Sequence, residues 1–234
     1  KVVNLGNVTI DGGGRIVLKA GNNERHFFAG TGVTFRLQNI TLRDGNSLVS
    51  GGAVEASGAN VILRNVQLLD NASTVTGGAI YCFDGTLDIA DSLLQNNTAV
   101  NSGGAIYNDG CALTITGSTF QGNQALDGGG LYLAVGSTAI LDDVTFAANG
   151  GGYGGGLENS GAVTVTNSLF DGNTVTGSGG GLWNQGGTAV VERTTVRNNR
   201  AYEGGGINSG GSQLLLTDVN ILDNEAAGAH GGGL

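Results

Sequence analysis

Apolar and polar residues alternate over short runs along most of the chain. In one such run Leu113 and Ile115 are apolar, while Thr114 and Thr116 are polar. The same alternation occurs at Val61/Leu63, Leu87/Ile89, Val163/Val165 and Leu214/Leu216. A period of two residues, rich in Val, Ile and Thr, predicts short strands with one buried face. Glycines interrupt the pattern every few residues, and helices tolerate them poorly.

The alternating runs belong to a longer sequence repeat. Its clearest copy, residues 103–123, has two glycines, a short apolar strand, a polar turn, an alternating strand and the element Phe120-x-x-Asn123. One marker, the aliphatic residue after the small pair, recurs every 25 to 27 residues at Val54, Ile80, Ile106, Leu131, Leu157, Leu182, Ile207 and Leu234. The second marker recurs at Leu68/Asn71, Leu94/Asn97, Phe120/Asn123, Phe146/Asn149, Phe170/Asn173, Val196/Asn199 and Ile221/Asn224. Two markers with one period establish a repeat.

A repeat of about 25 residues cannot bury its own apolar side, so copies have to stack. We therefore predict an all-β fold, a parallel β-helix of about eight or nine coils with ~25–26 residues per coil and strands ~4.8 Å apart. Residues 1–50 are expected to form irregular entry coils or a cap. Residues 51–234 are expected to form the regular repeats, and the uncapped end of the array at Leu234 is expected to continue into more coils or to be covered. Aligned asparagines should form a hydrogen-bonded ladder at Asn71, Asn97, Asn123, Asn149, Asn173, Asn199 and Asn224.

Composition narrows the function classes. Charged residues are only 12% of the chain and the formal net charge is −9. No basic stripe of the kind that binds nucleic acid occurs. No apolar run approaches the ~18 residues of a membrane helix, so we expect no membrane span in this chain.

The two markers together resemble a known repeat. Gly-Gly-Ala followed by Val or Ile stands at residues 51–54, 77–80 and 103–106, with Gly-rich variants in later copies. This motif with F-x-x-N is similar to the repeat of chlamydial polymorphic outer-membrane proteins and of bacterial surface proteins with pectin-lyase-like β-helices. The resemblance implies right-handed winding, export, and a role in adhesion or surface architecture. Several copies depart from it by placing Leu, Val or Ile where the pattern has Phe.

The residue that follows the recurring aliphatic residue should point outward, because that aliphatic residue points into the coil. Aromatic residues occupy this outward position on several coils. Such a column is a candidate platform for sugars or a partner protein. The alternative is an aromatic ladder that only stabilises the coils. The ligand-binding candidates are Tyr81, Tyr107, Tyr132, Glu158 and Trp183.

Two outward carboxylates are the candidates for catalysis. Asp142 and Glu192 share one strand position two coils apart, roughly 10 Å by strand spacing. An inverting glycosidase needs roughly 6.5–9.5 Å, and no lysine lies nearby to serve a lyase. Solvated turns are the favoured interpretation of these residues. No His, Cys and Asp cluster in the sequence has the spacing of a transition-metal site. A Ca²⁺ ion could bridge stacked turn carboxylates, but the sequence lacks the nonapeptide calcium repeat.

Cys82 and Cys111 lie on adjacent predicted coils, each beside an Asp-Gly turn. A tight turn can bring their Cα atoms within the ~4.4–6.8 Å that a disulfide needs. Two buried thiols are the alternative, and export would favour the bond.

A second outward column is apolar at four of its seven positions, Ile62, Asp88, Thr114, Ile140, Thr164, Val190 and Leu215. Packing against another chain would explain it. We therefore expect a non-enzymatic extracellular or cell-surface protein, an adhesin or structural component. The alternatives are a protein that binds or cleaves polysaccharides and a self-assembling filament or surface-layer subunit. The expected partners are a host or matrix glycan, a protein, or copies of the chain itself.

Overall fold

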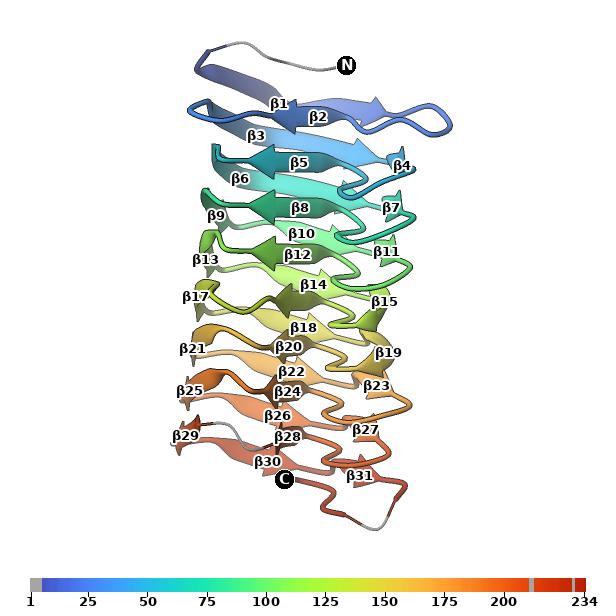
Figure 1. The fold of residues 1–234 in the computed structure, drawn as a ribbon, viewed down its shortest axis with the longest axis vertical. Coiled ribbons are helices and arrows are strands. Elements are labelled where there is room, and N and C mark those ends of the chain that lie inside the picture. Colours follow the sequence, from blue (N-terminus) through green and yellow to red (C-terminus); the bar gives the residue numbers. More distant parts are fainter. Residues whose placement is uncertain (1–5, 211–212, 229) are drawn as a thin grey trace.

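The computed structural model describes residues 6–210, 213–228 and 230–234, and this part of the chain is built from short parallel strands stacked coil on coil (Figure 1). The strands form three sheets, each of which contributes one side of the coil. The predicted all-β parallel solenoid is therefore confirmed. No helix in the described ranges is long and apolar enough to cross a membrane.

The first sheet faces the viewer in Figure 1 and carries the residues that follow the paired glycines. Each strand has only three or four residues, because a polar turn comes soon after the inward-facing aliphatic residue. Its strands in order are β2 (Phe27–Ala29), β5 (Val54–Ser57), β8 (Ile80–Phe83), β12 (Ile106–Asp109), β16 (Leu131–Leu133), β20 (Leu157–Asn159), β24 (Leu182–Gln185) and β28 (Ile207–Gly210).

The second sheet carries the alternating runs and is bent, so that each coil crosses it twice. It begins with the long strands β1 (Val8–Lys19), β3 (Thr34–Arg43) and β6 (Asn60–Leu69). Its first arm is β9 (Thr86–Ala90), β13 (Ala112–Thr116), β17 (Thr138–Asp142), β21 (Ala162–Thr166), β25 (Thr188–Glu192) and β29 (Gln213–Thr217). Its second arm is β10 (Leu93–Gln95), β14 (Thr119–Gln121), β18 (Thr145–Ala147), β22 (Leu169–Asp171), β26 (Thr195–Arg197) and β30 (Asn220–Leu222).

The third sheet closes the coil at the right of Figure 1. Its strands are β4 (Asn46–Ser47), β7 (Ala72–Ser73), β11 (Thr98–Ala99), β15 (Gln124–Asp127), β19 (Gly150–Tyr153), β23 (Thr174–Val175), β27 (Arg200–Ala201) and β31 (Glu225–Ala226). Within residues 6–50 the chain already takes part in the stack, since β3 pairs with β6 from Thr34↔Asn60 to Arg43↔Leu69. β1 is less regular, with a shift in pairing between Asp11 and Ile16.

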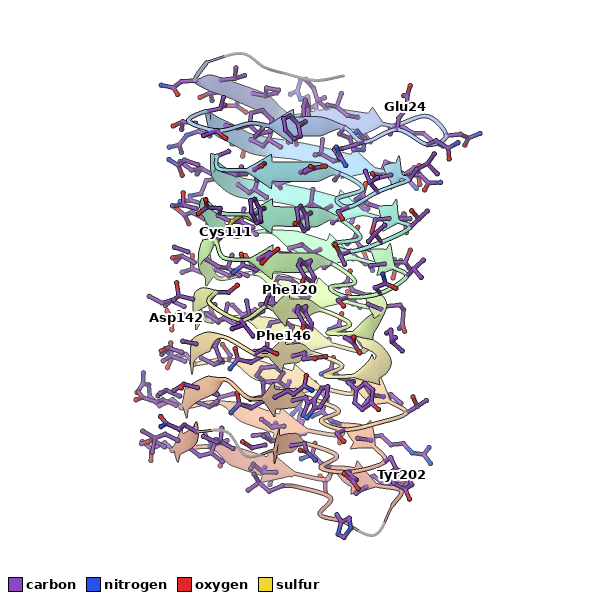
Figure 2. The ribbon with its side chains drawn as sticks, viewed as in Figure 1. Glu24, Cys111, Phe120, Asp142, Phe146 and Tyr202 are labelled. Atoms are coloured by element: carbon purple, nitrogen blue, oxygen red, sulfur yellow. A yellow bond between two sulfur atoms is a disulfide. The ribbon has the colours of Figure 1, made fainter. Side chains whose placement is uncertain are left out.

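Equivalent side chains align in columns inside the coils. Phe120, Phe146 and Phe170 are fully buried, and consecutive rings stack with centroids 4.8 and 4.9 Å apart. Phe120 and Phe146 are labelled in Figure 2. Each apolar residue thus packs against its own counterpart on the neighbouring coil. This contact between equivalent residues is why a repeat that cannot fold alone forms a core in the array.

A hydrogen-bonded ladder of asparagines lies where the second sheet turns into the third. The side-chain Oδ1 of Asn123 accepts bonds from the backbone N–H and the Nδ2 of Asn97, both at 2.9 Å. Asn123 Nδ2 donates to Leu94 O and to Asn149 Oδ1. The same bonds link Asn71, Asn97, Asn123, Asn149, Asn173, Asn199 and Asn224. Because these groups lie at a buried bend, the ladder supplies partners that strands cannot.

The bends themselves need left-handed backbone. The residue before each ladder asparagine has positive φ, as at Asn96 (φ 55°) and Gly122 (φ 66°). The bend between the two arms of the second sheet is left-handed too, as at Asp91 (φ 52°) and Asp143 (φ 55°). Asn, Asp and Gly adopt this conformation at the least cost, which explains their recurrence at both bends.

Candidate functional site

The predicted outward column lies on the first sheet and is in register from coil to coil. Tyr81 pairs with Tyr107, Tyr107 with Tyr132, Tyr132 with Glu158, and Glu158 with Trp183. The structure therefore places all five ligand-binding candidates in one continuous row. At the upper end of the row, Glu55 forms an ion pair with Arg25.

The three tyrosine rings stack on one another. Tyr81 and Tyr107 have centroids 5.7 Å apart, and Tyr107 and Tyr132 have centroids 5.0 Å apart. Both faces of Tyr107 are therefore covered, and a sugar ring has no free face there. This geometry favours the stabilising ladder for Tyr107. Burial, together with the nearby Asp109 carboxylate, raises the pKa of Tyr107 to about 12.

Trp183 has an aromatic partner that the sequence pattern did not indicate. Tyr153, at the end of β19, stacks on Trp183 with centroids 4.6 Å apart. The equivalent turn position one coil earlier is Asp127. Because this position varies among coils, the repeat gave no signal that an aromatic residue there would contact the column. Trp183 is the last of the five candidates in the row, and Tyr153 packs on it from the third sheet.

Glu158 is the exception in the outward column because it is buried, with 1% of its surface exposed. Its Cβ lies against Gly154, where a side chain of any other residue would clash at 2.7 Å. Burial, and then the negative charge of Asp127, raise the pKa of Glu158 to about 8, although the backbone N–H of Gly128 donates to it. The pKa of Asp127 is also raised by burial, opposed by a hydrogen bond from Ser102.

The two catalytic candidates lie in the register that the sequence predicted. Asp142 pairs with Thr166, and Thr166 with Glu192, so the carboxylates are two coils apart. Thr166 and Asn167 donate hydrogen bonds to Asp142 and hold its pKa below the ordinary range. Glu192 pairs with Arg193 at 2.9 Å. A general acid needs a raised pKa, so this arrangement does not favour acid catalysis by Asp142.

The second outward column lies on the first arm of the second sheet, and four consecutive coils there carry no charge. We call the outward residues of β13, β17, β21 and β25 at these positions the threonine–aliphatic face. It is composed of Ala112, Thr114, Thr138, Ile140, Ala162, Thr164, Thr188 and Val190. These residues line most of a shallow hollow of about 290 Å³. The carboxylates of Asp142 and Glu192 lie at its edge, and Figure 2 shows Asp142 projecting outward.

A third surface feature lies on the third sheet. Val100, Leu126 and Gly152 line a groove of about 450 Å³, and Leu126 is 56% exposed. Gly151 lets β19 lie close to β15 beside the groove, because a Cβ there would lie 1.6 Å from the carbonyl oxygen of Ala125. Asp127 follows Leu126 in the chain, so the groove adjoins this carboxylate.

Cys82 and Cys111 form a disulfide in this structure, with Cα atoms 6.1 Å apart (Figure 2). The bond joins β8 to the turn after β12, one coil further on. Both residues are fully buried.

Comparison with known proteins supports the fold. A family model described as the right-handed beta helix region matches residues 3–170 and, overlapping, residues 103–231. Neither the comparison with curated proteins nor the comparison with solved structures gave a match.

Proposed function

Because the chain belongs to the right-handed β-helix family, we propose that it is a non-enzymatic adhesin or structural protein of the cell surface that binds an extended polymer. The threonine–aliphatic face is the observation that carries this proposal. Eight outward residues on four adjacent coils are uncharged in a protein of net charge −9. Their positions repeat at the strand spacing of ~4.8 Å, and coils with Ala and Thr alternate with coils with Thr and an aliphatic residue. A partner that repeats about every 10 Å along its own length therefore meets similar side chains on every second coil.

A neutral polysaccharide fits the chemistry of this face best. Threonine hydroxyls bond sugar hydroxyls, and Ile140 and Val190 contact the apolar C–H surfaces of a sugar chain. An acidic polysaccharide would be repelled by the net charge. Protein interfaces concentrate Trp, Tyr, Arg and Met at their centre, and the threonine–aliphatic face carries none of these.

The proposed location outside the cell is supported by the disulfide. Such bonds persist in oxidising compartments and are rare in the reducing cytosol. The resemblance to bacterial surface repeats supports the same location.

Sedimentation of the chain with insoluble cellulose, chitin, xylan and mannan tests the proposal. Ile140→Asp places a charge in the hollow and is expected to weaken binding at least tenfold. Val135→Asp is the matched control, because Val135 is 81% exposed on the turn of the same coil. Retention by none of the four polysaccharides, or equal retention of both variants, would contradict the proposal.

Lateral self-association through the same face is the second candidate. Ile140 and Leu215 are 56% and 57% exposed on one column, an apolar surface that a second copy would cover. Light scattering and negative-stain imaging of native material separate the candidates. Fibres or sheets that Ile140→Asp disperses would support a structural polymer, whereas a monomer would leave polysaccharide binding.

The alternative of polysaccharide cleavage can be tested in the same incubations by assaying released reducing ends. Release that the double variant Asp142→Asn, Glu192→Gln abolishes would replace the binding proposal with an enzyme. We expect no such release, because hydrogen bonds from Thr166 and Asn167 hold the pKa of Asp142 below its ordinary range, whereas a general acid needs a raised one.

A further inference from the structure

Threonines and aliphatic residues form two opposite zigzags on the threonine–aliphatic face. One column, in register from coil to coil, consists of Ala112, Thr138, Ala162 and Thr188. The second column, two residues further along each strand, consists of Thr114, Ile140, Thr164 and Val190. On each coil one of the two positions is threonine, and the threonine changes column from each coil to the next. The aliphatic side chains follow the opposite path.

The four threonine hydroxyls of this zigzag are available to a ligand. None of them has a hydrogen-bond partner among the residues that the structure describes. Other outward threonines of the same arm are bonded to side chains of neighbouring coils. Thr86 donates to Asn60, and Thr166 donates to Asp142. The hydroxyls over the hollow therefore keep donor and acceptor capacity that the fold does not use.

The zigzag restricts the symmetry of a polymer that lies along the long axis of the solenoid. The same arrangement returns after two coils, roughly 10 Å by strand spacing, and after one coil the two columns are exchanged. A matching polymer has units that advance by about one coil and turn over from one unit to the next. A β-1,4-linked chain of pyranose rings has this two-fold screw geometry, because the equatorial bonds at both ends of each ring extend the chain and turn each ring over relative to the last.

We propose that the threonine–aliphatic face selects a β-1,4-linked glycan and binds one sugar ring per coil along the solenoid axis. The assignment rests on the proposed function and names the polymer that the same face binds. Each ring meets one threonine hydroxyl at one edge and one aliphatic side chain at the other. Because successive rings are turned over, the hydroxyl and the aliphatic residue exchange edges in step with the sugar.

An extended peptide does not match this face. Alternate residues of a β-strand repeat every ~6.8 Å, which is well short of two coils. A polyproline helix repeats every ~9.3 Å, but such segments dock on aromatic-lined grooves. The residues of the threonine–aliphatic face include no aromatic side chain. The period and the side-chain chemistry together therefore favour the glycan.

The extent of the zigzag sets the length of the ligand. On the coil before it, Asp88 pairs with Thr114 and places a charge in the second column. On the coil after it, Leu215 pairs with Val190, so two aliphatic residues follow each other in one column. The alternation thus covers the four strands β13, β17, β21 and β25, and four sugar rings span it.

Three tetrasaccharides of glucose that differ only in linkage test the selectivity. Cellotetraose is β-1,4-linked, laminaritetraose is β-1,3-linked and maltotetraose is α-1,4-linked. Isothermal titration calorimetry on the full chain is expected to give cellotetraose an affinity at least tenfold higher than the other two. Cellobiose should bind at least tenfold more weakly than cellotetraose, whereas cellohexaose should bind within about twofold of it.

An exchange of two outward residues separates their register from their composition. The double variant Ala162→Thr, Thr164→Ala keeps the same residue types on β21 but moves the hydroxyl into the other column. We expect it to bind cellotetraose at least fivefold more weakly than the wild type, at an unchanged Tm. Thr174→Ala, the matched control, removes an exposed threonine of the third sheet and should leave the affinity within twofold.

The results distinguish linkage selectivity from the proposed function itself. Equal affinity for the three tetrasaccharides, or no loss in the exchanged variant, would overturn the two-fold match and leave polysaccharide binding in place. Retention by an insoluble polysaccharide without binding of cellotetraose, or tighter binding of a polyproline peptide, would overturn it as well. Failure to bind both cellotetraose and the insoluble polysaccharides would contradict the proposed function together with the selectivity.

Discussion

Tyr107 and Tyr132 lie face to face on adjacent coils, with ring centroids 5.0 Å apart and an angle of 4° between the ring planes. Tyr81 covers the other face of Tyr107. The middle ring is enclosed by its own equivalents, as Phe146 is inside the coil. The array thus uses one device, the stacking of equivalent rings, on both its inner and its outer surface.

The enclosed phenol of Tyr107 should make the folded chain less stable at strongly alkaline pH. The pKa of Tyr107 is raised from 10.0 to about 12 in the folded chain. Its contribution to stability is therefore fully present below the unfolded pKa near 10 and is lost as pH rises towards about 12. We expect Tyr107→Phe to remove the last phenol to ionise in an ultraviolet titration. It should also reduce the loss of stability in this pH range. An unchanged titration curve would contradict the enclosure of this ring.

The asparagine ladder should be a major source of stability. Asn123→Ala removes the acceptor of two bonds from Asn97 and the donors to Leu94 O and Asn149 Oδ1. Each buried group left unpaired costs about 1–3 kcal/mol, so a loss of about 3 kcal/mol or more is expected. Urea denaturation measures it. Gln121→Ala, on the exposed side of the same coil, is the control and should change stability by less than about 0.5 kcal/mol.

The phenylalanine column offers a test of the core. Phe146 is fully buried between Phe120 and Phe170, so Phe146→Ala opens a cavity between two rings. Truncations of this kind cost about 3–5 kcal/mol. Phe83→Ala provides the comparison, because Phe83 is 45% exposed. Equal thermal stability of the two variants would be inconsistent with the stacked column.

Reduction of the disulfide should destabilise the chain. The bond closes a loop with a sequence separation of 29 residues. The chain-entropy model gives about 3.5 kcal/mol for a loop of this length. Thermal unfolding with and without reductant should show a lower Tm for the reduced wild type. The double variant Cys82→Ser, Cys111→Ser should be insensitive to reductant, and sensitivity in that variant would show that the effect arises elsewhere.

The fold could be predicted because each coil repeats the same side chains at the same positions. The period of Phe120, Phe146 and Phe170 and that of the ladder asparagines determine which residues stack. Register follows from the period, since equivalent residues pair in every sheet. The sequence also carries a second recurring polar position. Ser92, Ser118, Ser168 and Thr194 form a second column at the other bend, where Ser118 Oγ accepts from the N–H of Ser92.

The burial of Glu158 could not be predicted because it depends on positions that do not repeat. Glu158 belongs to a column that is half-exposed at Tyr107 and Tyr132 yet fully buried at Glu158. Asp127, whose negative charge contributes to the raised pKa of Glu158, occupies a turn position that is Ser102 one coil before and Tyr153 one coil after. The periodic pattern specifies which residues share a column, but the burial of one member depends on neighbours outside that column.

The disulfide between adjacent coils also determines how the array responds to a pulling force. A solenoid pulled from its ends can lengthen one coil at a time, because each coil contacts only its neighbours. The Cys82–Cys111 bond would remove the 29-residue span between its cysteines from that extension. At about 3.4 Å per residue this is roughly 100 Å of chain that tension cannot release. A stalk held under shear would therefore keep one crosslinked coil intact while the coils on either side uncoil.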